Sequence, residues 1–140
     1  MRFVLDNSVV MGWLFGAGTA QQRAYAARIL ALLTQPDHLA LVPASWALEV
    51  GQAIVRAEAK GLLQEARSAA FVGILGEMAI EVDAGANGRA LGDILQLARR
   101  HRLSTYSASY LELALRQDLP LASHDEALNQ AMCGVGGQLV

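Results

Sequence analysis

The chain has 140 residues, of which 54% are hydrophobic, and its 11 basic and 13 acidic side chains give a formal net charge of −2 at pH 7. This length predicts one domain with a substantial core, and the charge excludes general attraction to nucleic acid, which would instead need a local basic patch. No apolar run approaches the ~18 residues of a membrane span, so that class is excluded as well.

The start of the chain and its cysteine content predict a cytoplasmic protein. Arg2 leads straight into a predicted strand, which leaves no room for a signal peptide. Cys133 is the single cysteine, so no internal disulfide can form. We expect this thiol to pack inertly in a reducing compartment.

The first predicted strand is the short apolar run at residues 3–5, which polar residues follow at once. Its length suits a strand buried on both faces, as in a parallel sheet. Asn7 or Ser8 can cap the next helix, predicted over residues 9–15. Asp6 then lies at the carboxyl end of a strand, which is the edge where open α/β sheets bind ligands. The alternative is that Asp6 only caps the helix.

The rest of the chain alternates between helical and strand patterns. Apolar spacing predicts helices over 19–33, 45–60, 64–79, 88–100 and 107–117, a last helix starting at Ser123 or Asp125, and strands over 39–42, 80–82, 120–122 and 138–140. Residues 103–106 are predicted to be an extended link, and Ser107 the cap of the helix after it. This order favours a parallel, three-layer α/β/α sandwich with four or five strands, in a single domain over 1–140.

Three carboxylates can meet at one edge of this sheet. Glu49 shares a helix face with the apolar Trp46 and Val50, where a charge is costly unless it is paired or bound to a metal. Asp6 and Asp125 follow the first and fourth strands, whose carboxyl ends lie on the same edge of a parallel sheet. Oxygen ligands without His or Cys suit Mg²⁺ or Mn²⁺ rather than Zn²⁺. From spacing alone the signal is weak, since any α/β protein has acids near strand ends.

Sequence segments across nearly the whole chain resemble one known family. Residues 106–115 (YSASYLELAL) and 119–128 (LPLASHDEAL) resemble the C-terminal half of PIN-domain ribonucleases of the VapC toxin type. Residues 3–8 (FVLDNS) and 42–53 (VPASWALEVGQA) are similar to that family's other two signatures, in the same order. The resemblance implies a PIN-like fold and a Mg²⁺-dependent endoribonuclease that cleaves RNA by metal-assisted hydrolysis and is neutralised by a small antitoxin. It also implies that the metal ligands and catalytic residues are Asp6, Glu49 and Asp125.

One position departs from the family pattern. Members usually have an aspartate directly after the tyrosine at position 106, whereas this chain has Ser107, which can cap a helix but carries no charge. Glu112 would point about 140° away on the helical wheel, and Asp93 lies on another helix, so neither replaces the missing acid. A second metal ion would be the one most affected. An alternative function is therefore a cleavage-impaired PIN domain that binds antitoxin or RNA.

Further residues are candidates for contacting substrate. Arg99, Arg100, His101 and Arg102 form the one basic cluster, which can hold phosphates or simply offset the dipole at the end of a helix. His124 can contact a leaving phosphate, with an exposed loop histidine as the alternative. The predicted substrate-binding residues are Ser8, Ser107, Arg99, Arg100 and Arg102.

The predicted helix over 9–15 carries more apolar residues than one face can bury. Exposed apolar surface usually marks an interface, so we expect a homodimer and an antitoxin groove in which Trp13, Phe15 and Trp46 take part. A phospho-acceptor signalling domain is the remaining alternative. It is disfavoured because Asp6 is followed by Asn7 rather than by a second acid, and because Lys60 is the only lysine.

Overall fold

A parallel four-stranded sheet lies at the centre of the computed structural model, which describes residues 1–140. Its order is β3-β2-β1-β4, and its strands are β1 (Arg2–Leu5), β2 (Leu39–Pro43), β3 (Ile80–Asp83) and β4 (Leu121–Ala122). The predicted parallel sheet is confirmed with four strands. At the C-terminus, only an isolated bridge between Leu121 and Leu139 forms in place of the predicted fifth strand.

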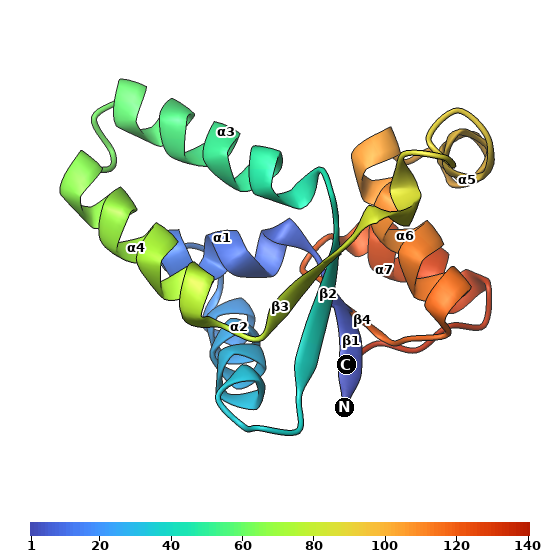
Figure 1. Ribbon diagram of the computed structural model, residues 1–140, viewed down its shortest axis with the longest axis horizontal. Coiled ribbons are helices and arrows are strands. Elements are labelled where there is room, and N and C mark those ends of the chain that lie inside the picture. Colours follow the sequence, from blue (N-terminus) through green and yellow to red (C-terminus); the bar gives the residue numbers. More distant parts are fainter.

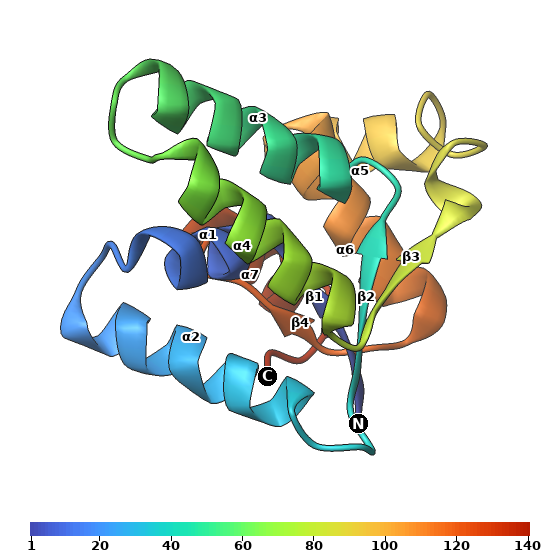
Figure 2. The same ribbon diagram turned by 60° about the vertical axis from the view of Figure 1, so that its left-hand side comes forward.

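Helices cover both faces of the sheet, as the α/β/α prediction requires. The helices are α1 (Asn7–Phe15), α2 (Ala20–Leu33), α3 (Trp46–Ala59), α4 (Glu65–Glu77), α5 (Asp93–His101), α6 (Thr105–Gln117) and α7 (Glu126–Gly134), with a short 3₁₀ turn η1 (Ala84–Ala86). Helices α1 to α4 lie on one side of the sheet and α5 to α7 on the other (Figures 1 and 2). None of them is long and apolar enough to cross a membrane.

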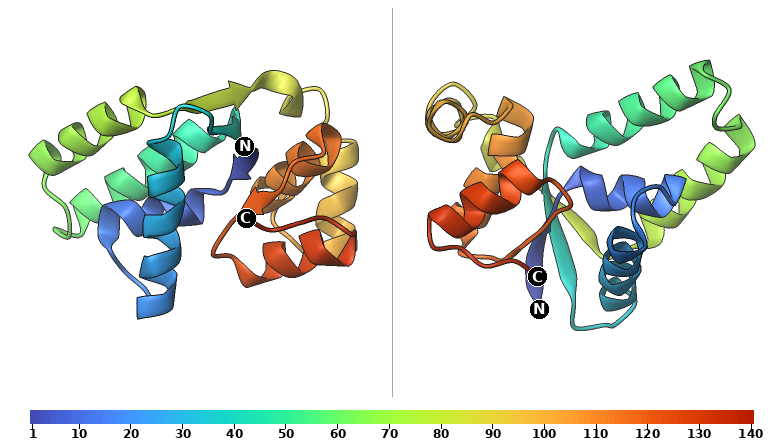
Figure 3. Two further views of the ribbon diagram at one scale, coloured as in Figure 1. Left: turned by 90° about the horizontal axis from the view of Figure 1, so that it is seen from below. Right: turned by 180° about the vertical axis from the view of Figure 1, so that it is seen from behind.

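Strand β1 is the centre of the core because both helical layers cover it. Phe3, Val4 and Leu5 are fully buried and belong to one apolar cluster that extends through both helical layers. Val4 pairs with Leu41 of β2 and with Leu121 of β4. The two chain ends lie close together at the opposite end of this strand from Asp6 (Figure 3).

Local capping signals set several helix boundaries as predicted. Thr19 accepts the Gln22 amide proton at 3.1 Å, while the Gln22 side chain accepts that of Thr19 at 2.9 Å, which completes a capping box at the start of α2. Gly16 ends α1 with φ of 62°, a left-handed conformation that glycine adopts at little cost. Ser45 and Asp125 are the N-cap residues of α3 and α7.

Three predicted boundaries are wrong. Helix α1 begins at Asn7 with Asp6 as its N-cap residue, so neither Asn7 nor Ser8 caps it and the helix is two residues longer than predicted. Helix α6 begins at Thr105, and its cap is Ser104, whose hydroxyl accepts the Ser107 amide proton at 3.0 Å. Residues 105 and 106 are therefore helical rather than extended, and Ser107 lies inside the first turn. Helix α5 begins only at Asp93 rather than at residue 88, so Leu91 lies before the helix and is 87% exposed. Cys133 is exposed on α7, which corrects the expectation of a packed thiol.

Candidate functional site

Asp6 lies where β1 ends and α1 begins, and it is only 7% exposed. Although it is the N-cap residue of α1, its side chain makes no capping hydrogen bond, so the prediction that it serves only as a cap is wrong. Its Oδ2 accepts hydrogen bonds from the hydroxyls of Ser8, at 2.6 Å, and Ser123, at 2.7 Å. The backbone amide of Ser8 also lies close enough to the carboxylate to lower its pKa, but neither serine hydroxyl donates to Oδ1. The carboxylate is thus held through one oxygen while the other remains available.

The charge on Asp6 is held at an energetic cost. The pKa of Asp6 is raised, and burial is the largest cause. The charge of Asp125 also raises this pKa, whereas the hydrogen bonds from the hydroxyls of Ser8 and Ser123 lower it without cancelling the effect of burial. Burial and like charge both disfavour the ionised form. A cation beside the free oxygen would offset both effects.

Ser123 and Ser8 connect the loop after β4 to the end of β1. Strand register places Leu5 opposite Ala122, so the residues that follow, Asp6 and Ser123, lie side by side. The Ser123 hydroxyl also accepts the amide proton of Asp125 at 2.9 Å, and the Ser8 hydroxyl accepts that of His124 at 2.9 Å. The Ser8 hydroxyl is thus engaged within the protein, and its predicted contact with substrate stays a prediction.

Asp125 has two different carboxylate oxygens. Its Oδ1 accepts the amide proton of Leu128 at 3.0 Å and so caps α7, whereas its Oδ2 has no protein donor. Its charge is close enough to raise the pKa of Asp6. Asp125 therefore caps a helix and also faces the same acidic centre.

Glu49 is half-buried on the first turn of α3 and points toward α6. Its Oε2 accepts a hydrogen bond from the Tyr110 hydroxyl at 2.7 Å, and no arginine pairs with it. Burial raises the pKa of Glu49, the Tyr110 hydroxyl lowers it, and the charge of Asp6 raises it. Asp6 thus interacts electrostatically with both of the other predicted carboxylates.

Tyr110 is a member of the site that the sequence reasoning missed. It is 1% exposed, and burial, followed by the charge of Glu49, raises the pKa of its hydroxyl, which keeps it a hydrogen-bond donor. The available signal was its position three residues after Ser107, since residues at that spacing share a helix face. Ser123 was also missed as a member of the site. The available signal was its position directly after β4, the strand that pairs with β1.

We predict that Tyr110→Phe raises the pKa of Glu49 further, because the substitution removes the hydrogen bond that favours the ionised carboxylate. The variant should also lose about 1 kcal/mol of unfolding free energy, the usual effect of one hydrogen bond. Carbon-detected NMR titration of the Glu49 carboxyl group measures the first effect. Tyr106→Phe, which removes an exposed hydroxyl, is the matched control. An unchanged Glu49 titration in Tyr110→Phe would contradict the assignment.

The donor set suits a hard cation that retains part of its water shell. No three His, Cys, Asp or Glu side chains stand close enough together to form a ready-made metal cluster. Mg²⁺, however, is usually bound through one or two carboxylates plus water. Four oxygen atoms at this edge accept no hydrogen bond from the protein: Oδ1 of Asp6, Oδ2 of Asp125, Oε1 of Glu49 and the buried side-chain carbonyl of Asn7. The residues present therefore fit Mg²⁺ or Mn²⁺.

His124 borders this centre, since its backbone amide donates to the Ser8 hydroxyl at 2.9 Å. His124 is half-buried against Tyr25, with ring centroids 5.3 Å apart, and burial lowers the pKa of the imidazole. The alternative of an exposed loop histidine is therefore wrong. Ser107 is half-buried one helical turn before Tyr110, and its role in binding substrate stays a prediction.

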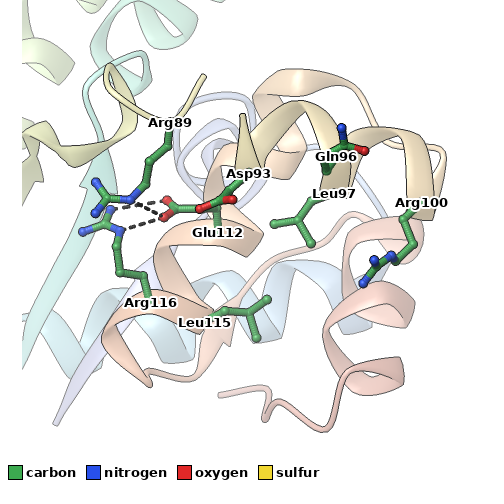
Figure 4. A pocket seen from close by; sticks show the side chains of 8 residues that line it. All are labelled: Arg89, Asp93, Gln96, Leu97, Arg100, Glu112, Leu115 and Arg116. Carbon is green, nitrogen blue, oxygen red and sulfur yellow. Dashed lines mark hydrogen bonds and ion pairs between the residues drawn. The ribbon is translucent and has the colours of Figure 1, made fainter. Parts of the chain in front are cut away.

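The basic cluster lies on another part of the surface. Arg99 and Arg100 lie in the last turn of α5, and Arg102 ends the helix in a left-handed conformation with φ of 53°. Arg100 lines a pocket of ≈ 560 Å³ between α5 and α6, and none of the three site carboxylates lines it (Figure 4). Contact of these arginines with RNA remains a prediction.

Glu112 forms ion pairs within this pocket, which agrees with the prediction that it points away from position 107. Its Oε1 lies 2.7 Å from Nε of Arg116 and 3.3 Å from Nε of Arg89 (Figure 4). Arg116 also pairs with Asp83 at the end of β3 and lowers the pKa of that carboxyl group. Asp93, exposed at the start of α5, lines the same pocket. Neither acid replaces the charge missing at position 107.

The exposed apolar surface differs from the one predicted. Trp13 packs against the core and donates from Nε1 to the Ala26 carbonyl at 2.7 Å, so α1 leaves mainly Phe15 exposed. The sequence prediction assumed that α1 buries only one face, whereas both α2 and α3 pack against it and bury more of its apolar side chains. Large exposed apolar side chains lie instead on and beside α3 and α4: Leu48, Val55, Leu62, Val72 and Ile74.

Comparison with known proteins identifies the fold. No protein-family model and no curated protein matches the sequence. Among solved structures, the chain is similar to VapBC2 from Rickettsia felis, a structure that contains a DNA fragment from the VapBC2 promoter. The TM-score is 0.68, and the identity is 9% over 100% of this chain and 98% of that one. It is also similar to PAE2754 from Pyrobaculum aerophilum, with a TM-score of 0.64 and 18% identity over 94% of this chain and 79% of that one. The chain has a PIN-like fold.

Proposed function

We propose that this protein is a metal-dependent endoribonuclease of the PIN type and the toxin of a toxin–antitoxin pair. The observation that carries the proposal is the environment of Asp6. Its carboxylate is buried, is held by two serines through Oδ2, keeps Oδ1 free, and lies within electrostatic range of Glu49 and Asp125. A carboxylate whose charged form is disfavoured at a ligand-binding sheet edge is typical of a functional site.

Each residue has a distinct role in the proposed reaction. Asp6, Glu49 and Asp125 would hold Mg²⁺ or Mn²⁺, which supplies Lewis acidity toward the scissile phosphate and charge neutralisation. Oε1 of Glu49, which no protein group engages, can accept a proton from the attacking water, a role that a raised pKa favours. Helices α1, α3 and α7 all start at this edge, and their positive ends favour a bound phosphate.

The proposed protein partner is an antitoxin that supplies an amphipathic helix. A groove of ≈ 360 Å³ between α3 and α4 is lined mainly by apolar side chains, including Trp46, Ile54 and Val72. Such grooves accept the apolar face of a helix. The similarity to a VapBC2 structure supports this choice. Leu48 and Val55, both exposed on α3, support the homodimer, because exposed apolar surface of this kind usually marks an interface.

A second candidate function rests on Ser107. The uncharged side chain leaves the acidic centre one carboxylate short of the pattern that the resemblance implies. The chain would then be a cleavage-impaired PIN domain that binds antitoxin or RNA without hydrolysis.

Cleavage of a structured RNA by the purified protein separates the two candidates. We expect cleavage that requires Mg²⁺ or Mn²⁺, is lost with EDTA, and falls in Glu49→Gln and Asp125→Asn. Asp93→Asn, which neutralises an exposed acid on α5, is the matched control and should cleave normally. If metal-loaded protein binds the RNA but never cuts it, the binding module is the correct function.

We predict that Ser107→Asp tightens Mg²⁺ binding and raises the cleavage rate, because it adds a carboxylate one turn from Tyr110. Repulsion from the other acids should lower the unfolding free energy of the metal-free variant, by up to about 1 kcal/mol, although the helix dipole offsets part of the loss. Mg²⁺ should then stabilise this variant more than the parent chain. Thermal melts with and without Mg²⁺ measure the difference, and Ser107→Asn is the neutral control. Identical behaviour of the two variants would show that position 107 does not face the site.

A further inference from the structure

A second, uncharged pocket lies beside the acidic centre. Its volume is ≈ 220 Å³, and it lies between the start of α3, the segment after β3, and the first turn of α6. The polar or aromatic side chains that line it are Ser45, Asn87, Thr105, Tyr106 and Ser109, and no charged side chain is among its lining residues. This neutrality contrasts with the three carboxylates nearby.

Helix geometry fixes the position of this pocket relative to the acidic centre. Ser45, the N-cap residue of α3, is four residues before Glu49 and accepts the Glu49 amide proton at 3.0 Å, and Tyr106 is four residues before Tyr110 on α6. Residues at this spacing are neighbours on a helix surface, with Cβ atoms about 5–6 Å apart. Glu49 and Tyr110 are hydrogen-bonded to each other at 2.7 Å. The pocket therefore opens about one helical turn from this pair, on both helices at once.

The lining of the pocket suits a flat, neutral, aromatic ligand. The Tyr106 side chain is 58% exposed although it belongs to the pocket wall, and Leu91 beside it is 87% exposed. Nucleobases stack on exposed aromatic rings of this kind in proteins that bind single strands. The amide of Asn87 and the hydroxyls of Ser45 and Thr105 offer donors and acceptors for base edges. A phosphate, in contrast, would find no cation in this pocket.

We propose that this pocket binds a nucleobase of single-stranded RNA, stacked on Tyr106, next to the scissile phosphate at the acidic centre. The assignment rests on the proposed ribonuclease function and adds a specificity subsite to it. The pocket is smaller than the roughly 300 Å³ at which sites for drug-sized ligands begin, as expected for a site that takes one base. Tyr106 acts here as a binding residue and takes no part in proton transfer.

Fluorescence of a single-stranded RNA that carries 2-aminopurine tests the subsite without cleavage. The protein is used in an Asp6→Asn background, in which the RNA is expected to stay intact. We expect binding to quench the 2-aminopurine at one position of the strand. Tyr106→Phe should keep both the quenching and the affinity, whereas Tyr106→Leu should lose the quenching and weaken binding by about 5-fold to 100-fold. Phe15→Leu, which changes an exposed aromatic residue on α1, should have no effect.

The outcomes separate this proposal from the proposed function. Equal quenching and affinity in Tyr106→Leu and Tyr106→Phe would overturn the subsite while leaving metal-dependent cleavage by the parent chain as it stands. Absence of RNA binding by every variant, together with no cleavage by the parent chain, would overturn both. Thermal melts of each variant exclude loss of folding as the cause of weaker binding.

Discussion

Asp6→Asn should reduce RNA cleavage by at least ~100-fold and, at the same time, make the metal-free protein more stable at neutral pH. Loss of a residue that only supports a metal ligand lowers metal affinity or activity by about 10-fold to 100-fold. Loss of a direct ligand should therefore lower activity by at least as much. The gain in stability follows because asparagine keeps the shape of the side chain and an oxygen to accept the Ser8 and Ser123 hydrogen bonds, without the buried charge.

The stability gain should depend on pH in a defined direction. Burial, with a further contribution from Asp125, raises the pKa of Asp6 in the folded protein above its unfolded value near 3.8. The folded state therefore holds this proton more tightly, and the wild-type protein loses stability as pH rises from the unfolded pKa through the folded one. The advantage of Asp6→Asn should be absent below the unfolded pKa and complete above the folded pKa.

Urea unfolding of both proteins in EDTA, at a series of pH values, measures this difference. We expect a gain of about 1 kcal/mol at pH 7, the ordinary scale of single substitutions. Saturating Mg²⁺ should reduce the gain or reverse it, because an ion bound to the native wild-type protein stabilises that protein by mass action. A less stable Asp6→Asn protein at pH 7 without metal would contradict the inferred cost of the Asp6 charge.

Arg116→Met should lower the unfolding free energy by about 2–4 kcal/mol. This is slightly less than the roughly 3–5 kcal/mol lost when one partner of a fully buried ion pair is removed, because Arg116 is partly exposed. Arg116 pairs with Glu112 at 2.7 Å and also with Asp83, and both acids are mostly buried. Methionine fills a similar volume but leaves these two carboxylates without their main partner. Because Arg116 lowers the pKa of Asp83, the loss should shrink as pH falls from the unfolded value of Asp83 toward its folded pKa.

Thermal and urea unfolding of Arg116→Met, against Arg99→Met as a control, measure the contribution of this cluster. Arg99 is an exposed cation with no ion-pair partner, so its substitution should change stability by less than about 0.5 kcal/mol. Adding Glu112→Met to Arg116→Met should recover part of the loss, since it removes a buried carboxylate whose only remaining partner would be the more exposed Arg89. If the double variant is less stable still, packing rather than charge dominates at this position.

Local signals were enough to predict much of the fold. The short run before Asp6 has the length of a buried strand, and Thr19 with Gln22 forms a capping box whose pattern is visible in the sequence. The parallel order of strands and helices then places Asp6 and Ser123 at one edge. These features depend on neighbours along the chain, and for that reason they can be predicted from it.

The predictions fail where contacts between distant parts of the chain determine a helix boundary or the burial of a side chain. Ser104 and Ser107 are both good caps, three residues apart, and the sequence alone does not choose between them. The burial of Trp13 depends on two helices that pack against α1 from elsewhere in the chain. The hydrogen bond between Tyr110 and Glu49 depends on how α3 and α6 approach each other, which no spacing within either helix specifies.

Anomalous diffraction from a crystal soaked in Mn²⁺ tests the central claim most directly, because it locates the ion without reference to activity. We expect one Mn²⁺ peak at the carboxyl edge of the sheet, bound directly by Oδ1 of Asp6 and held by Glu49 and Asp125 directly or through its water ligands. In a crystal of Asp6→Asn the peak should be weak or absent. A strong Mn²⁺ peak elsewhere on the surface, with none at Asp6 in the wild-type protein, would contradict the account.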